Sequence, residues 1–223
     1  AAVSTMIGAG RFVPIFNDKH LAWSFTDAHA MYTTAKRLGI PLLAGSTVPL
    51  AWRNPVGSEW PMDAEMTEIV TVGYGPTEIY GYHILEGMQV HAERRQGGES
   101  GLTGDAATQA INDGTVNPDL LDKALRTFDI SDEEREQAKQ SVKDVFLVEY
   151  ADGLRGAIVN CDEVIRNFGT AAKGPDTEFA SQSILLGYPH AHFIFLTRHA
   201  ETLVLEGKPA YPVERTYLTT GIL

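Results

Sequence analysis

The sequence has a single cysteine, Cys161, so it can form neither an intrachain disulfide nor a zinc site built from cysteines. It also lacks any apolar stretch that approaches the roughly 20 residues needed to span a bilayer. The first residues carry no basic region or apolar core of the kind found in signal peptides. These absences favour a reducing compartment, so we expect a cytoplasmic protein with no membrane partner.

Positive charge is scarce as well. The chain has 18 Lys and Arg residues against 29 Asp and Glu, which gives a formal net charge of −11. This balance disfavours the phosphate neutralisation that dominates nucleic-acid affinity, so we expect no nucleic acid as partner. A hydrophobic content of 43% in 223 residues is that of a globular chain with one large domain or two small ones.

Two motifs of common enzymes are missing. There is no G-x-S-x-G, which excludes the usual nucleophile elbow of a serine hydrolase, and no G-x-G-x-x-G dinucleotide fingerprint. Gly8-Ala9-Gly10 is a lone G-x-G that precedes a strand, whereas a phosphate site needs glycines before a helix. We therefore do not expect this segment to bind a dinucleotide.

Residues 12–45 are predicted to form a strand, a helix and a second strand. The helix spans 25–38, with apolar residues at helical spacing and Gly39 at its end. Such a unit implies two parallel strands joined by a right-handed crossover. The tripeptide Asp18-Lys19-His20 follows the first strand, at the edge where open α/β sheets bind ligands. The alternative is a solvated charged turn.

The rest of the sequence predicts antiparallel rather than parallel strand pairing. Asp152-Gly153 lies between two apolar runs and predicts an antiparallel hairpin, and Ser131 with Glu134 forms a capping box. The expected elements are strands at 65–73, 145–150, 154–161 and 179–186, and helices at 77–95, 118–128, 131–143 and 190–206. This pattern predicts a parallel α/β fragment over 1–55 and, over 56–223, an α+β domain with an open, mainly antiparallel sheet covered by helices on one face.

The run from Val13 to Ala22, with Asp18-Lys19-His20 at its centre, resembles the EKP loop of the Gfo/Idh/MocA oxidoreductases. The segment Gly81-Tyr82-His83-Ile84-Leu85-Glu86 is similar to the G-x-H-x-x-D motif of that family, and Gly207-Lys208-Pro209 after a helix also fits it. The similarity is greater to a branch that reads Asp-Lys-His-Leu. The resemblance implies a partial Rossmann-like domain, followed by a substrate and oligomerisation domain.

The same resemblance implies an NAD(P)-dependent dehydrogenase that acts on a sugar or polyol. Lys19 and His83 would then be catalytic, and Asp18, Lys19 and His20 would bind NAD or NADP. Removal of hydride from an alcohol needs a base for the hydroxyl proton. A lysine beside a positively charged nicotinamide ring loses its proton more readily, and an imidazole can serve instead.

Substrate contacts are expected from Arg53, which could pair with a carboxylate or phosphate, and from Glu86. No metal site is assigned, although His83, Glu86 and His91 on one helix would suit a metal-dependent sugar lyase or isomerase.

The sequence departs from the family pattern in three ways, of which the absent fingerprint and Ile79 favour a non-catalytic binding or assembly protein on the same scaffold. His20 replaces the motif proline, and Ile79 lies where active dehydrogenases commonly carry an aspartate. The front half of the nucleotide domain is also missing, which implies a fragment of a longer protein or a shortened descendant. In the resembled family the free sheet face commonly forms an interface, so a homo-oligomer is expected.

Overall fold

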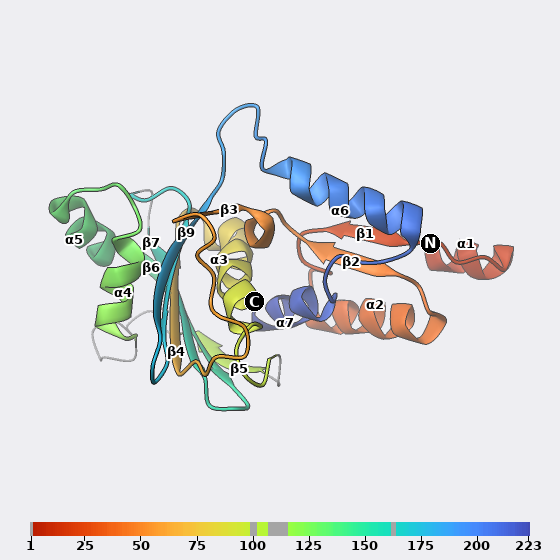
Figure 1. Cartoon of the computed structure of the whole chain (residues 1–223). Coiled ribbons are helices and arrows are strands. Elements are labelled where there is room, and N and C mark those ends of the chain that lie inside the picture. Colours follow the sequence, from red (N-terminus) through yellow and green to blue (C-terminus); the bar gives the residue numbers. More distant parts are fainter. Residues whose placement is uncertain (1, 99–101, 107–115, 162–163) are drawn as a thin grey trace.

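The computed structural model describes residues 2–98, 102–106, 116–161 and 164–223, whose strands form two sheets (Figure 1). The smaller sheet pairs β1 with β2 in parallel, and the larger has the strand order β3-β9-β8-β4-β7-β6-β5. Within the larger sheet only β4 and β7 are parallel, and every other pair is antiparallel. The predicted fold class, a partial Rossmann-like unit followed by a mainly antiparallel sheet, is confirmed.

The smaller sheet belongs to the predicted strand-helix-strand unit. Ser24 caps its helix by accepting a hydrogen bond of 3.1 Å from the backbone of Asp27, and Gly39 ends the helix with φ of 62°. A short helix that the sequence did not predict precedes the unit. The elements are α1 (Ala2–Ala9), β1 (Ile15–Asp18), α2 (Phe25–Leu38) and β2 (Leu42–Gly45).

The rest of the chain, after β2, contains the strands of the larger sheet and the remaining helices. Its first half contains η1 (Val48–Leu50), β3 (Trp52–Asn54), β4 (Glu68–Gly73), α3 (Thr77–Ala92), β5 (Leu102–Ala106), α4 (Pro118–Leu125) and α5 (Asp132–Gln140). The second half contains β6 (Val142–Tyr150), β7 (Arg155–Cys161), β8 (Phe168–Lys173), β9 (Glu178–Ile184), α6 (Phe193–Glu206) and α7 (Glu214–Ile222).

Local sequence signals located several of these elements. The hairpin predicted at Asp152-Gly153 joins β6 to β7, and the capping box of Ser131 and Glu134 starts α5. Strands β3, β5 and β8 were missed. Strand β8 contains Gly169, Ala171 and Ala172, residue types that are depleted in strands, and it is a strand because both its neighbours pair with it.

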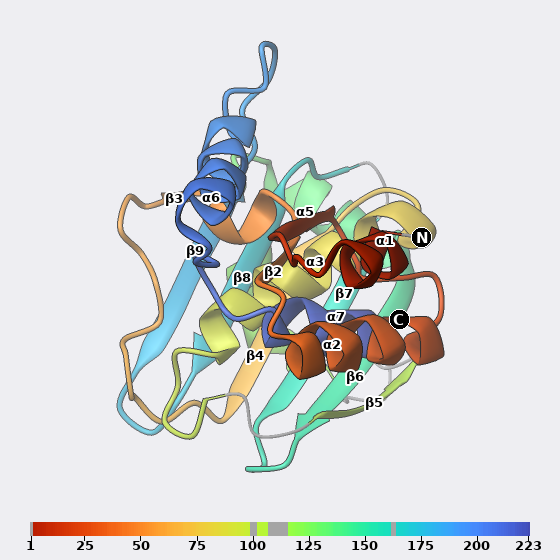
Figure 2. The ribbon, with the colours of Figure 1, turned by 90° about the vertical axis from the view of Figure 1, so that its right-hand side faces the viewer.

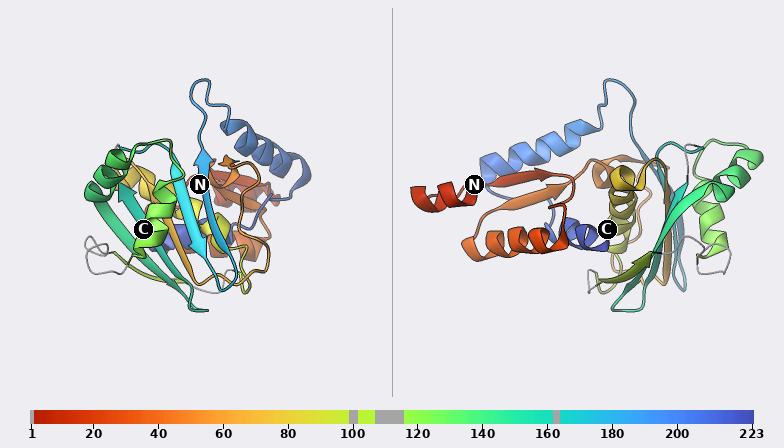
Figure 3. Two further views of the ribbon diagram at one scale, coloured as in Figure 1. Left: turned by 60° about the vertical axis from the view of Figure 1, so that its left-hand side comes forward. Right: turned by 180° about the vertical axis from the view of Figure 1, so that it is seen from behind.

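Helices cover both faces of the larger sheet, whereas the sequence predicted helices on one face. Helix α3 lies on the face toward the smaller sheet, whereas α4 and α5 lie on the other, as both views in Figure 3 show. Strand β4 explains this arrangement, because Ile69 packs in the α3 cluster and Val70 in the α4 cluster. Side chains of a strand alternate between faces, so a strand that is apolar on both needs two layers of cover.

The last two helices return to the smaller sheet. Helix α6 lies along one side of β1 and β2, while α2 and α7 lie on the other (Figures 1 and 2). Val213 joins the core of α2 and β2, and Leu203 of α6 packs with Leu43 of β2 and Tyr211. The division at residue 55 stays a prediction, and the C-terminal helices contact the part of the chain that precedes it.

Candidate active site

The carboxyl ends of β1 and β2 form the first part of the site. Lys19 directly follows β1, and its backbone N–H donates a hydrogen bond of 3.0 Å to the carbonyl of Gly45 at the end of β2. Lys19 adopts the left-handed conformation with φ of 69°, which is uncommon for a residue with a side chain. Its side chain is exposed at the edge where parallel strands of α/β folds bind ligands.

Helix α3 lies against this edge. The hydroxyl of Tyr82 donates a hydrogen bond of 3.1 Å to the carbonyl of Lys19. The Tyr82 ring also meets His20 edge to face, with the ring centroids 5.7 Å apart. Burial, followed by the charge of Glu86, raises the pKa of Tyr82 well above 10, so the hydroxyl stays protonated and available as a donor. This hydrogen bond ties the turn of α3 that carries Tyr82 and the next residue, His83, to the end of β1.

Ser46, His83 and Glu86 form one hydrogen-bonded cluster. Ser46 follows β2 directly, and its Oγ lies 3.0 Å from Nδ1 of His83. The same hydroxyl donates to Oε2 of Glu86, and the backbone N–H of Ser46 donates to Oε1 at 2.9 Å. Nδ1 of His83 is 3.5 Å from Oε2 of Glu86. Ser46 therefore joins the end of β2 to both His83 and Glu86 on α3.

The two side chains on α3 differ in exposure. The His83 side chain is 13% exposed, whereas that of Glu86 is 0% exposed. Around His83 lie the rings of Tyr80, Tyr82 and Phe168, with centroid distances of 6.0, 5.8 and 6.2 Å. The imidazole thus borders solvent within an aromatic surround, and the carboxylate lies beneath it. The substrate contact predicted for Glu86 stays a prediction, and the contacts shown are with Ser46 and His83.

Arg53, also predicted to bind substrate, lies apart from this cluster. Its guanidinium is buried and donates to the carbonyls of Val48, Pro49 and Ala51 and to Oγ of Ser183 at 2.7 to 3.3 Å. Burial lowers its pKa to about 10, against a small opposing effect of a nearby glutamate. In the structure the Arg53 side chain therefore holds η1 and β3 together, and its role toward a substrate stays a prediction.

His91, the third residue of the metal alternative, lies eight positions after His83 on the same helix. Eight residues correspond to about 12 Å of helix axis. His91 is buried against Phe179, with ring centroids 4.7 Å apart, and burial lowers its pKa well below 6.5. Among the described residues no group of three or more His, Cys, Asp or Glu side chains could hold a metal ion.

The glycines near helix ends do not form a phosphate cradle in the described part of the chain. Gly8 and Gly10 lie at the C-terminal end of α1 rather than before a helix. Gly73 and Gly75 do precede α3, but a Cβ at Gly73 would lie 2.5 Å from Ile84 and one at Gly75 would lie 2.5 Å from Tyr80. Side chains of α3 therefore pack directly against both glycines, which accounts for the absence of a side chain at these positions without a ligand.

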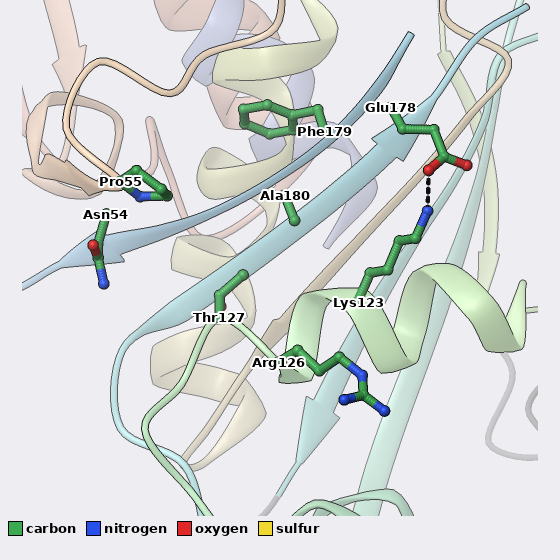
Figure 4. Close-up of a pocket in the computed structure, with 8 residues that line it drawn as sticks. All are labelled: Asn54, Pro55, Lys123, Arg126, Thr127, Glu178, Phe179 and Ala180. Atoms are coloured by element: carbon green, nitrogen blue, oxygen red, sulfur yellow. Dashed lines mark hydrogen bonds and ion pairs between the residues drawn. The ribbon is translucent and has the colours of Figure 1, made fainter.

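A separate cavity of about 540 Å³ lies by α4 (Figure 4), and its lining includes neither Lys19 nor His83. Its lining includes Lys123 of α4, Arg126 directly after α4, and Glu178 and Phe179 of β9, and an ion pair joins Lys123 to Glu178. These cations already have acidic neighbours, since Arg126 pairs with Asp122. We assign no ligand to this cavity, because none of its side chains is buried and unpaired.

Searches against protein-family models and against curated proteins gave no match. Among solved structures, the chain is similar to GenD2 from gentamicin A biosynthesis in complex with NAD, at 13% identity and a TM-score of 0.59 over 97% of this chain and 68% of that one. A myo-inositol dehydrogenase from Corynebacterium glutamicum matches at 10% identity and a TM-score of 0.57, over 99% of this chain and 71% of that one. An oxidoreductase from Agrobacterium radiobacter in complex with NAD+, L-tartaric acid and magnesium matches at 14% identity and a TM-score of 0.52, over 98% of this chain and 70% of that one.

These similarities show that the chain has the fold of dehydrogenases. More particularly, it is the fold of the Gfo/Idh/MocA-type oxidoreductases, so the resemblance is confirmed at the level of the fold, while the roles of Asp18, Lys19, His20 and His83 stay predictions. In the described residues no helix is both long and apolar enough to cross a membrane.

Sequence reasoning missed Ser46 and Tyr82. A signal for Ser46 was present, because it is the first residue after a predicted parallel strand, where polar side chains face the ligand. Tyr82 had no such signal, since a tyrosine within a helix is most often part of a core.

Proposed function

We propose that this chain carries the substrate side of an NAD(P)-dependent dehydrogenase site for a sugar or polyol, with Lys19 and His83 as the catalytic residues. The observation that carries the proposal is the convergence of two elements: the exposed Lys19 at the end of β1, and the partly exposed His83 on α3, joined through Tyr82. Such a lysine and imidazole can orient a secondary alcohol and accept its proton.

The chain's own residues have separate tasks in this proposal. The Lys19 side chain hydrogen-bonds the reacting hydroxyl, and Nε2 of His83 accepts the hydroxyl proton. The aromatic rings of Tyr80 and Phe168 beside His83 limit the access of water. A nicotinamide, when bound, would supply the hydride acceptor.

The fit to the cofactor is partial. Asp18, Lys19 and His20 lie at the carboxyl end of β1, and we retain them as the predicted contacts of the nicotinamide end. The described residues offer no cradle for the diphosphate, so no step is derived through the dinucleotide. NAD complexes among the similar structures support a nicotinamide cofactor at the level of the family.

The alternative, a non-catalytic binding or assembly protein, is supported by that missing cradle and by Ile79, which is exposed where the family commonly has an acid. The metal-dependent lyase or isomerase has no comparable support. The carbohydrate partner, the homo-oligomer and the cytoplasmic location remain predictions of the same proposal, and light scattering tests the oligomer.

Titration of the purified chain, at verified intact mass, with NADH and NADPH tests the proposal. We expect saturable enhancement of nicotinamide fluorescence and its weakening in Lys19→Ala. Turnover of a panel of sugars and polyols should also be lost in Lys19→Ala, while the unfolding midpoint stays unchanged because this side chain is exposed. Absence of binding to either dinucleotide would favour the non-catalytic alternative, and full activity of Lys19→Ala would refute the assignment of this residue.

A further inference from the structure

Glu86 has an unusual position for a charged residue. Its side chain is 0% exposed, and among the described residues the basic group within 4.0 Å of its carboxylate is Nδ1 of His83. Burial of a carboxylate is costly unless hydrogen bonds and a counter-charge compensate it. Ser46 supplies two hydrogen bonds, one from the backbone and one from the hydroxyl. A buried carboxylate behind a partly exposed imidazole therefore requires an explanation.

The proton positions in this cluster follow from the donors present. The Ser46 hydroxyl has one hydrogen and donates it to Oε2 of Glu86. Its oxygen is then an acceptor, both for the backbone N–H of Val48 at 3.3 Å and for Nδ1 of His83 at 3.0 Å. Nδ1 must therefore carry a hydrogen, and in the neutral ring this leaves the lone pair on Nε2. The hydrogen bond made by one ring nitrogen thus sets the state of the other.

The backbone holds this geometry in place. A Cβ on Gly45 would lie 3.0 Å from Oε1 of Glu86, 2.8 Å from the hydroxyl of Tyr211 and 3.2 Å from Oγ1 of Thr216. Thr216 in turn donates a hydrogen bond of 2.7 Å to the carbonyl of Ala44. The end of β2 and the start of α7 therefore enclose the carboxylate, so Glu86 and Ser46 have little freedom to rearrange.

We propose that Glu86 and Ser46 are positioning residues that hold His83 in the tautomer with hydrogen on Nδ1, so that Nε2 is the base. This inference rests on the proposed function only in naming the proton that Nε2 accepts. When the substrate O–H bond breaks and the Nε2–H bond forms, the Nδ1 hydrogen stays on the ring and the Ser46 hydrogen stays directed at Glu86. The buried carboxylate then stabilises the imidazolium.

Ser46 has no role as a nucleophile in this arrangement. It is buried, and its hydrogen is directed at a carboxylate rather than at the imidazole, which is the reverse of the order that activates a serine.

The test is the tautomer of His83, read from nitrogen-15 correlation spectra of the imidazole at a pH above the titration of free histidine. The resonance is assigned by its loss in His83→Asn. We expect the wild-type chain to show hydrogen on Nδ1. In Ser46→Ala and Glu86→Gln the spectrum should move toward hydrogen on Nε2. Glu78→Gln is the matched control, since Glu78 is exposed on the same helix, and should leave the His83 signals unchanged.

Hydrogen on Nε2 in the wild-type chain, or an unchanged tautomer in both variants, would overturn the inference. The wild-type spectrum decides even if a variant fails to fold. In a catalytically active protein, Ser46→Ala should also lower kcat by about 10-fold or more with little change in KM, because it alters the base and not the binding contacts. A chain without turnover that still shows the Nδ1 tautomer would refute the proposed function and leave this inference intact.

Discussion

The hydroxyl of Tyr82 donates a hydrogen bond to the backbone carbonyl of Lys19, and this bond joins helix α3 to the end of strand β1. The two residues are 63 positions apart in the sequence. Lys19 has φ of 69°, a conformation that a side-chain-bearing residue keeps only when its surroundings hold it. The bond therefore contributes to the placement of the lysine relative to His83, the residue that follows Tyr82.

Replacement of Tyr82 by phenylalanine should weaken this connection. Tyr82→Phe leaves the Lys19 carbonyl without its donor, so we expect a loss of about 1 kcal/mol in the free energy of unfolding, measured by urea denaturation. Tyr188→Phe is the control, because Tyr188 is 93% exposed and should give no change. Equal stability of both variants would contradict the connection.

Gly45 should tolerate no side chain. Its φ is 131°, and an added Cβ would approach the Tyr211 hydroxyl to 2.8 Å. Gly45→Ala should therefore lower the free energy of unfolding by about 2 kcal/mol or more. Gly187→Ala, where a Cβ meets open space, is the control and should be close to neutral. A stable Gly45→Ala chain would show that the end of β2 is not packed against Glu86 as described.

The ion pair of Arg95 and Asp152 predicts how stability depends on pH. Burial alone would raise the pKa of Asp152, but the hydrogen bond and charge of Arg95 outweigh it and hold the pKa below 3.8. Because the folded pKa is depressed, the pair stabilises the protein fully above about pH 3.8 and loses this effect as the pH falls through the folded pKa. The Arg95 side chain is 1% exposed and would be left without a counter-charge.

Asp152→Asn should therefore cost about 2 kcal/mol at neutral pH, and the difference from the wild-type chain should shrink in acid. The measurement is a series of urea unfolding curves between neutral and acidic pH. Glu178→Gln, which breaks the exposed pair with Lys123, should leave the unfolding curve unchanged. A cost for Asp152→Asn that does not vary with pH would be inconsistent with the ionic origin.

Cys161 should be unreactive in the folded chain. It is buried in β7, and burial raises the pKa of its thiol to about 12, so the thiolate that reacts with alkylating agents is not formed at neutral pH. Iodoacetamide should label the protein in urea but not under native conditions, as measured by intact mass. Rapid labelling of the native chain would mean that β7 opens readily or that Cys161 lies nearer the surface.

Where the sequence succeeded, the signal was local. Helix α2 was predicted over its observed span because its cap, apolar spacing and terminal glycine all lie within the segment. The hairpin of β6 and β7 was predicted for the same reason, from Asp152-Gly153 and its flanking apolar runs. Strand β8 was missed because its residues have no strand pattern of their own, and its pairing with β4 and β9 depends on distant segments.

The candidate site also combines features that local sequence predicts with contacts that only the tertiary structure shows. The sequence alone determined that Lys19 follows a strand and that His83 and Glu86 share a helix, since both facts follow from chain order and helical spacing. Only the tertiary structure decided that Ser46 lies between His83 and Glu86, that Glu86 is buried, and that Arg53 bonds to backbone carbonyls. The Ser46 contacts join segments about 40 residues apart and form because β2 ends against α3, whereas the Arg53 bonds to backbone carbonyls are local but need a buried guanidinium that no sequence pattern showed.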